Sequence, residues 1–135
     1  MFLKFQIKSN DLSEGGIVAS TVKKILISKN IDKATIRKVA IAVYEAEINV
    51  VIHSNGGSAE IEITDDFVKV DFIDIGPGID DIPMALSEGW STASDYARGN
   101  GFGAGMGLPN IKALTDEFNI MSSPDGTELK IGFRI

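Results

Sequence analysis

Two glycine-rich segments limit the folds open to this chain more than any other feature of its sequence. Residues 74–79 read Asp-Ile-Gly-Pro-Gly-Ile, and residues 101–107 carry a glycine at every second position. Glycine is favoured where φ is positive or where a ligand approaches the backbone closely. A helical pattern begins directly after the second segment, so the N–H groups of its first turn point into that loop. We therefore expect a loop that binds an anion, and phosphate is the usual one.

The composition indicates one globular domain, residues 1–135, because 44% of the chain is apolar. A net charge of −6 argues against general nucleic-acid or anionic-membrane partners, since both need a basic face. The lack of cysteine excludes disulfides and thiolate metal sites. No apolar run approaches the ~20 residues of a membrane span, and no signal-peptide core is present, so a cytoplasmic protein is expected.

The hydrophobic periodicity predicts an α+β protein. The predicted strands are 2–8, 59–63, 67–73, one at Ile120 and 129–133, and the predicted helices are 17–30, 32–54, 82–86 and 105–118. This order favours a two-layer α/β sandwich, in which a mixed sheet carries helices on one face. Strand 2–8 is expected at an edge, where it can pair with a second copy in a homodimer. The polar, aperiodic stretch 88–104 is predicted to form a lid.

Charged and polar residues inside the largely apolar helix 32–54 require a reason, because unpaired buried charge is costly. Glu45 and Asn49 are four residues apart, which places them about 6 Å apart on one face. An acid and an amide there can hold Mg²⁺ and accept a proton from a nucleophile. The same spacing also fits two solvated residues at a sheet edge. Glu47 lies between them and has no role in the pattern.

The two glycine segments each allow a functional and a simpler interpretation. A carboxylate at Asp74 can accept the amino group of adenine and so reject guanine, but Asp before Pro-Gly is also a common turn. The glycines at 101–107 can cradle phosphates or form a flexible tether. They match neither the P-loop nor the dinucleotide fingerprint.

Together these motifs resemble the GHKL (Bergerat-fold) ATPases. The chain carries the N, G1, G2 and G3 boxes of that superfamily in order and at matching spacing, as Glu45-xxx-Asn49, Asp74-x-Gly76-x-Gly78, Gly101-x-Gly103-x-Gly105-x-Gly107 and Gly126-Thr127. The segments 89–92, 107–109 and 116–118 are most similar to those of bacterial anti-sigma-factor and stress-switch serine kinases.

The resemblance implies a role for each matching residue. Glu45 would be the catalytic base, Asn49 the Mg²⁺ ligand and Asp74 the adenine acceptor, with Thr127 helping through water. Gly76 and Gly78 would line the base pocket. The lid glycines would bind the phosphates: Gly101, Gly103, Gly105 and Gly107. The family pattern assigns no cation to the γ-phosphate, for which Arg98 or Lys112 is a candidate. His53 could border the phosphates, but a lone histidine more often has a structural role.

We therefore expect a serine/threonine-protein kinase that uses Mg·ATP, releases ADP and phosphorylates a small regulatory protein of the anti-anti-sigma type. A sigma factor is a second candidate partner. Two alternatives stay open: a non-catalytic module whose partner binding depends on nucleotide, and a stand-alone ATPase domain of the histidine-kinase type. The second would need a separate phosphoacceptor, because the only histidine is His53.

Overall fold

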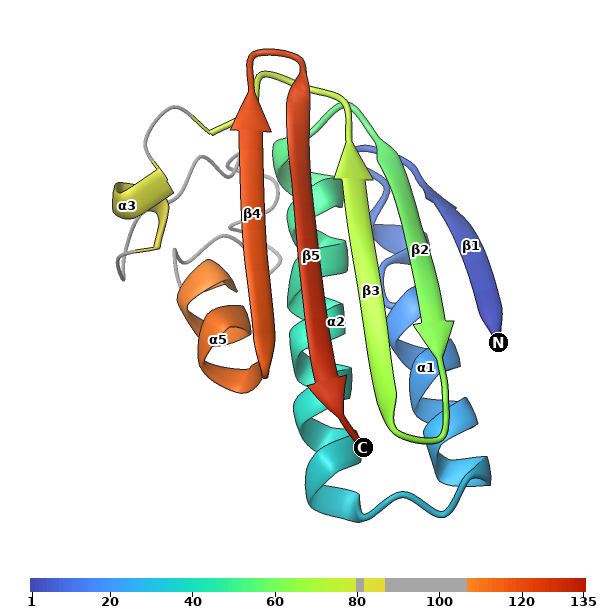
Figure 1. Ribbon diagram of the computed structural model, residues 1–135. Coiled ribbons are helices and arrows are strands. Elements are labelled where there is room, and N and C mark those ends of the chain that lie inside the picture. Colours follow the sequence, from blue (N-terminus) through green and yellow to red (C-terminus); the bar gives the residue numbers. More distant parts are fainter. Residues whose placement is uncertain (80–81, 87–106) are drawn as a thin grey trace.

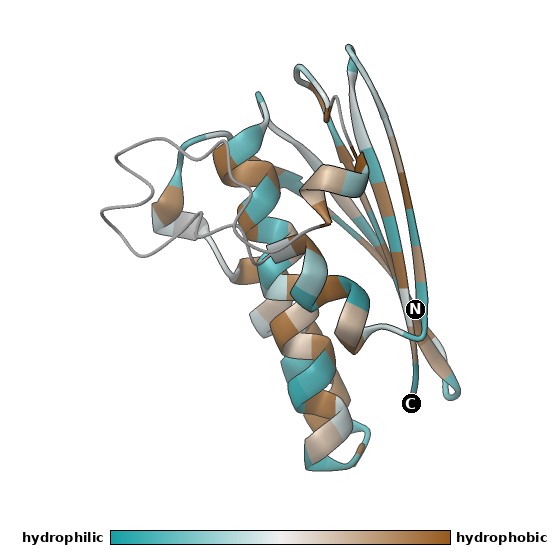
Figure 2. Cartoon of the chain, turned by 90° about the vertical axis from the view of Figure 1, so that its left-hand side faces the viewer, coloured by the Kyte–Doolittle hydropathy of each residue, from teal (hydrophilic) through white to brown (hydrophobic). Residues whose placement is uncertain are grey.

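The computed structural model describes residues 1–79, 82–86 and 107–135. A five-stranded sheet forms one layer and the helices lie on one of its faces, as predicted (Figures 1 and 2). The strands are β1 (Phe2–Ile7), β2 (Gly57–Ile63), β3 (Phe67–Asp74), β4 (Glu117–Ser123) and β5 (Gly126–Arg134). The helices are the 3₁₀ turn η1 (Leu12–Glu14), α1 (Ile17–Ser28), α2 (Lys33–His53), α3 (Ile82–Ala85) and α5 (Gly107–Leu114).

The sheet has the strand order β1-β2-β3-β5-β4, and each adjacent pair is antiparallel. The prediction of a mixed sheet is therefore wrong for the described strands. Tight hairpins join β2 to β3 and β4 to β5, and hairpins produce antiparallel neighbours. β3 and β4 run in the same direction, but β5 lies between them and pairs with both. The expected edge position of the first strand is confirmed.

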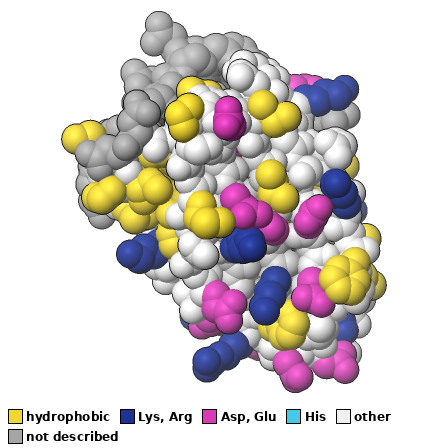
Figure 3. All heavy atoms as spheres, turned by 45° about the horizontal axis from the view of Figure 1, so that its top comes forward, with side chains coloured by type: hydrophobic (Ala, Val, Ile, Leu, Met, Phe, Trp, Pro, Cys, Tyr) yellow, Lys and Arg dark blue, Asp and Glu magenta, His cyan; other side chains and the backbone are white. Residues whose placement is uncertain are grey.

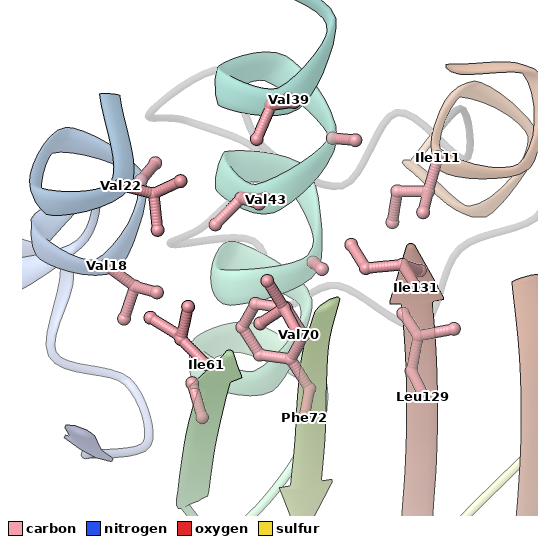
Figure 4. Packing of buried hydrophobic residues seen from close by; sticks show 14 of the residues in the cluster. Val18, Val22, Val39, Val43, Ile61, Val70, Phe72, Ile111, Leu129 and Ile131 are labelled. Atoms are coloured by element: carbon pink, nitrogen blue, oxygen red, sulfur yellow. The ribbon is translucent and has the colours of Figure 1, made fainter. Parts of the chain in front are cut away.

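The core lies between the sheet and the helices. α2 is its centre, because α2 packs against α1, α5 and β3. Figure 4 shows the apolar side chains of both layers pointing toward one another. Those buried to 2% exposure or less include Val18, Val22, Val39, Val43, Ile61, Val70, Phe72, Ile111 and Ile131. Burying a side chain of this size contributes about 1.5–3 kcal/mol, so this packing fixes how α2 is rotated against the sheet.

One helix is shorter than predicted. Leu114 and Phe118 are four residues apart, which suits a helix, but α5 ends at Leu114 and Phe118 lies in β4 opposite Ile131. Beyond the helix, Asp116 binds the chain to β5: its N–H donates to the Gly132 carbonyl and its carboxylate accepts from the Arg134 N–H. From there apolar or small side chains alternate at Phe118, Ile120 and Ser122, a period of two that suits the strand.

Several expectations fall outside the described residues. The lid 88–104, Arg98, and glycines 101, 103 and 105 all lie there, so they stay predictions. Within the described part of the chain, the helices are too short or too polar to cross a membrane.

Candidate nucleotide site

The helix α2 presents the predicted acid–amide pair near its C-terminal end. Asp32 begins this helix by accepting the Thr35 N–H at 3.0 Å, as expected of a cap. Glu45 and Asn49 are both partly exposed, one turn apart on a helix that is otherwise largely buried. Burial raises the pKa of the Glu45 carboxyl. Burial also disfavours the charged form of His53 on the last turn of α2, and so lowers its pKa.

Gly107, the last glycine of the segment 101–107, lies against Asn49. A methyl group placed on Gly107 would lie 3.1 Å from Asn49 Oδ1 and 3.2 Å from its Nδ2. Gly107 is also the first residue of α5, which packs against α2. The structure therefore brings the start of α5 and the Asn49 amide together, although 58 positions separate them in the sequence.

Asp74 lies where β3 ends, close to the β4–β5 hairpin. Its Oδ1 accepts the Thr127 N–H at 2.9 Å, and the carboxylate keeps further lone pairs for a ligand donor. Burial raises the pKa of Asp74, and the hydrogen bond from Thr127 partly opposes that shift. Asp74 is thus a half-buried hydrogen-bond acceptor beside Thr127. These are the two residues that the resemblance assigns to adenine binding.

The loop after Asp74 is tied to two neighbouring turns through its backbone. Ile75 exchanges hydrogen bonds with the 55–56 turn: its N–H donates to Gly56 and its carbonyl accepts from Asn55. The Gly76 N–H donates to the Asp125 carbonyl at 3.2 Å. These bonds fix the loop between the end of α2 and the last hairpin.

Ser122 is a site residue that the sequence analysis missed. Its hydroxyl accepts the Ile79 N–H at 2.6 Å and lies 2.8 Å from the Thr127 hydroxyl. Ser122 faces Thr127 across the β4–β5 pair. The one signal that could have found it is its place in the strand opposite Thr127, which needs the hairpin register.

Two glycines are required by the geometry of this loop. Gly78 has φ +74°, and a methyl group there would lie 1.9 Å from the Ser123 carbonyl oxygen. Gly126 has φ +153°, and its methyl group would lie 2.1 Å from the Asp74 carbonyl oxygen. Another residue at either position would force the loop and the hairpin apart, which explains these two glycines without reference to a ligand.

Glu47 has a structural role that the sequence did not reveal. Its side chain is 1% exposed and accepts three backbone N–H groups at the start of α1: Gly16 at 2.9 Å, Val18 at 3.2 Å and Ala19 at 3.1 Å. Gly16 precedes α1 in a left-handed conformation and has no side chain with which to cap it. Glu47 therefore caps α1 from α2, since carboxylates stabilise a helix N-terminus. Burial raises its pKa, and the backbone bonds oppose that shift.

These residues fit a nucleotide with its metal better than a metal alone. Among the residues that the structure describes, no group of three His, Cys, Asp or Glu side chains gathers to hold an ion. A single amide oxygen at Asn49 suits Mg²⁺ that arrives on phosphates, because Mg²⁺ usually shares its ligands with them. Lys112, the described candidate cation, is exposed in the last turn of α5.

Comparison with known proteins decides the family. Residues 10–133 match the family described as the histidine kinase-like ATPase domain. The chain belongs to this family. It is 30% identical over 126 residues to the serine/threonine-protein kinase RsbT of Bacillus subtilis (strain 168), covering 88% of this chain and 89% of RsbT.

A solved structure supports the same fold. The crystal structure of the RsbU and RsbW domains of Rv1364c from Mycobacterium tuberculosis superimposes with a TM-score of 0.66 at 19% identity. The match covers 99% of this chain and 32% of that longer one. The GHKL resemblance and the Bergerat fold are thereby confirmed, and membership in an ATPase family implies that the nucleotide is ATP.

Proposed function

We propose that this protein transfers the γ-phosphate of Mg·ATP to a serine or threonine hydroxyl of a small regulatory protein. The observation that carries the proposal is the half-buried Glu45 on α2, one turn from Asn49, in a chain similar to the kinase RsbT over most of its length. Phosphoryl transfer needs mainly positioning, charge neutralisation and one proton acceptor; in this proposal Glu45 is the acceptor and Asn49 holds the Mg²⁺ that neutralises charge.

Glu45 acts as the base in this proposal. The partner's hydroxyl oxygen forms the new bond to the γ-phosphorus, the bond to the ADP oxygen breaks, and the hydroxyl proton passes to the Glu45 carboxylate. Because burial raises the pKa of Glu45, its carboxylate is a better proton acceptor than a fully exposed one.

The remaining residues bind and orient ATP. Asp74 accepts the adenine amino group, and Thr127 assists through a water. Gly76 and Gly78 line the base pocket. Asn49 holds the Mg²⁺, whose chemical contribution is to neutralise phosphate charge. The four lid-segment glycines, of which Gly107 lies against Asn49, donate backbone N–H groups to the phosphates.

We take the phosphoacceptor to be a regulatory protein from the similarity of this chain to the kinase RsbT and to a structure that contains an RsbW domain. A sigma factor is a second partner in the same class. Phosphate-transfer assays with each purified candidate distinguish the two, since only the phosphoacceptor takes up the γ-phosphate of ATP.

The test uses two substitutions on α2. Glu45→Gln should leave the Kd for Mg·ATP near the wild-type value and slow phosphate transfer by ~10²–10⁴, the range for a lost general base. Asn49→Ala removes a metal ligand, so it should weaken Mg·ATP binding as well as transfer. Calorimetry measures binding, and labelled ATP with the captured partner protein measures transfer.

Both variants must first show the wild-type circular dichroism spectrum, because α2 forms the centre of the core. If Glu45→Gln transfers phosphate at the wild-type rate, Glu45 is not the catalytic base. A wild-type protein that binds ATP and its partner but transfers nothing would favour the non-catalytic nucleotide-dependent module.

A further inference from the structure

Positive charge is concentrated in one part of an otherwise acidic chain. Residues 17–44, which comprise α1 and the first half of α2, contain six of the thirteen Lys and Arg residues and one of the nineteen Asp and Glu residues. Their net charge is +5 in a chain whose total is −6. The six cations are Lys23, Lys24, Lys29, Lys33, Arg37 and Lys38.

Three cations lie in the first two turns of α2, and the first of them, Lys33, is placed against the preference of the helix itself. The N-terminal end of a helix carries a partial positive charge, which disfavours Lys and Arg there. The first turn of α2 nevertheless contains Lys33 and no acid, and Arg37 and Lys38 follow, all exposed. The two ion pairs of the described residues, Lys4–Glu60 and Lys29–Asp65, involve none of the three. Ion pairing within the described residues therefore does not explain these charges.

The exposed side of α2 carries both these cations and Glu45, the proposed catalytic base. Lys38, Ile41 and Glu45 are spaced by three and four residues, so they share one face of the helix, with Arg37 beside them. Ile41 is 39% exposed, which is unusual for isoleucine in the middle of a core helix. Figure 1 shows the first turns of α2 extending beyond α5 at the bottom of the molecule. We call Arg37, Lys38 and Ile41 the α2 stripe.

We infer that the α2 stripe is the docking surface for the phosphoacceptor protein, which presents carboxylates and an apolar contact beside its reactive hydroxyl. This rests on the proposed function. Lys38 lies seven residues before Glu45, about 10 Å along the helix, which is well within one protein interface. A carboxylate bound at Arg37 or Lys38 would therefore leave the partner's hydroxyl within reach of Glu45.

Charge also favours a protein over the other polyanions that a basic stripe might attract. Nucleic acid or an anionic membrane presents a broad negative surface to the whole molecule, and the net charge of −6 repels it. A protein with a local acidic patch meets only the stripe and the cations of α1. Opposite local charges of this kind mainly increase the association rate and select the partner.

The experiment compares two doubly charge-reversed proteins. Arg37→Glu/Lys38→Glu alters the stripe, and Lys8→Glu/Arg134→Glu makes the same change in charge at exposed residues near the ends of β1 and β5. Full-length wild type and both variants, loaded with Mg·ATP, are used to capture proteins from the source cells. Each captured protein is purified and tested for binding and for phosphorylation by the wild type.

The expected result is an acidic protein that the wild type phosphorylates and that binds Arg37→Glu/Lys38→Glu at least about tenfold more weakly, a rise of one decade in Kd. The control pair should bind it as the wild type does. Replacing carboxylates beside its phosphorylated residue by lysine should restore binding to Arg37→Glu/Lys38→Glu, which a mere folding defect could not produce.

Three results would overturn the inference. The first is a phosphorylated partner that binds both doubly reversed proteins equally well, which leaves the proposed kinase activity standing. The second is that no captured protein depends on the stripe. The third is stripe-dependent binding of duplex DNA or of phosphatidylserine vesicles in place of a protein. A stripe-dependent partner that is never phosphorylated would instead count against the kinase activity, because docking would then occur without transfer.

Discussion

At the scale of single residues, the proposed site contains two carboxylates that are half buried. Asp74 and Glu45 both lose part of their hydration, and burial raises the pKa of each. The two side chains then differ in what surrounds them. Asp74 accepts a backbone N–H from Thr127, which holds it as a fixed hydrogen-bond acceptor. Glu45 lies on the outward side of α2, where a partner can reach it.

The raised pKa of Glu45 predicts the acid side of the pH–rate profile. The base works only when ionised, so transfer should fall as the pH drops through the Glu45 pKa, at a higher pH than for an exposed glutamate. Single-turnover transfer at saturating ATP, measured from about pH 5 to 8, gives this limb. The residual transfer rate of Glu45→Gln should not fall in this way as the pH is lowered. If the variant keeps the same acid limb, another group is responsible for it.

At the scale of the elements, Glu47 joins α2 to α1, because its carboxylate accepts hydrogen bonds from three backbone N–H groups at the start of α1. Glu47→Gln keeps the shape of the side chain but replaces one acceptor oxygen by a donor that faces N–H groups. We expect a loss of about 1–3 kcal/mol of unfolding free energy, the cost of leaving buried donors unpaired. Urea unfolding followed by circular dichroism measures it. Glu117→Gln, on the exposed side of β4, is the control and should change stability by no more than about 0.5 kcal/mol. Equal midpoints for the two variants would contradict the capping role.

The sequence predicted the features of the site that are local in the chain. The Asp32 cap and the one-turn spacing of Glu45 and Asn49 follow from helix periodicity within a single element. The partners of Glu47 and Asp74 could not be predicted in the same way. Glu47 bonds to residues 28 to 31 positions away, and Asp74 to a residue 53 positions away. Such pairs depend on helix packing and strand register, which no short pattern encodes.

Phe118 shows the same limit at an element boundary. Its spacing from Leu114 suits a helix, and its alternation with Ile120 suits a strand. Phe118 adopts the strand conformation because it pairs with Ile131 of β5. That partner lies in a different segment, so the local pattern around Phe118 does not reveal it. Long-range pairing thus overrides local periodicity where both patterns are short.

At the scale of the whole molecule, the outer face of the sheet is open and mixes charges of both signs (Figure 3). Asp71 lies in its centre, with Glu60 of β2 and Lys130 of β5 directly opposite on either side. Its Oδ1 is buried and has no hydrogen-bond partner within the described residues. Burial, the hydrogen bond with Glu128 and the negative charge of Glu128 raise the pKa of Asp71 to about 6, while Lys130 opposes the shift.

The raised pKa of Asp71 predicts how stability depends on pH. A folded-state pKa raised to about 6 means that the native state binds the proton more tightly than the unfolded state. The resulting stabilisation is complete below the unfolded pKa of about 4 and is lost as the pH rises through about 6. Asp71→Asn should therefore be more stable than the wild type at pH 7 by about 1 kcal/mol, after discounting for solvent screening.

Urea unfolding of the wild type and Asp71→Asn at several pH values gives the comparison. The advantage of the variant should shrink as the pH is lowered from about 7 to about 4, because the wild-type carboxyl becomes protonated. A constant difference across that range would show that the Asp71 carboxyl does not titrate as described.

Nucleotide binding tests most directly whether this protein has an adenine-nucleotide site in which Asp74 recognises the base. Calorimetry should show that the wild type binds Mg·ATP at least about tenfold more tightly than Mg·GTP, and that Asp74→Asn weakens ATP binding by about 10–100-fold and removes the preference, since one charged hydrogen bond to the base is worth about 1.5–3 kcal/mol. Equal affinity of the wild type for ATP and GTP, or an Asp74→Asn protein that binds ATP as the wild type does, would contradict the account.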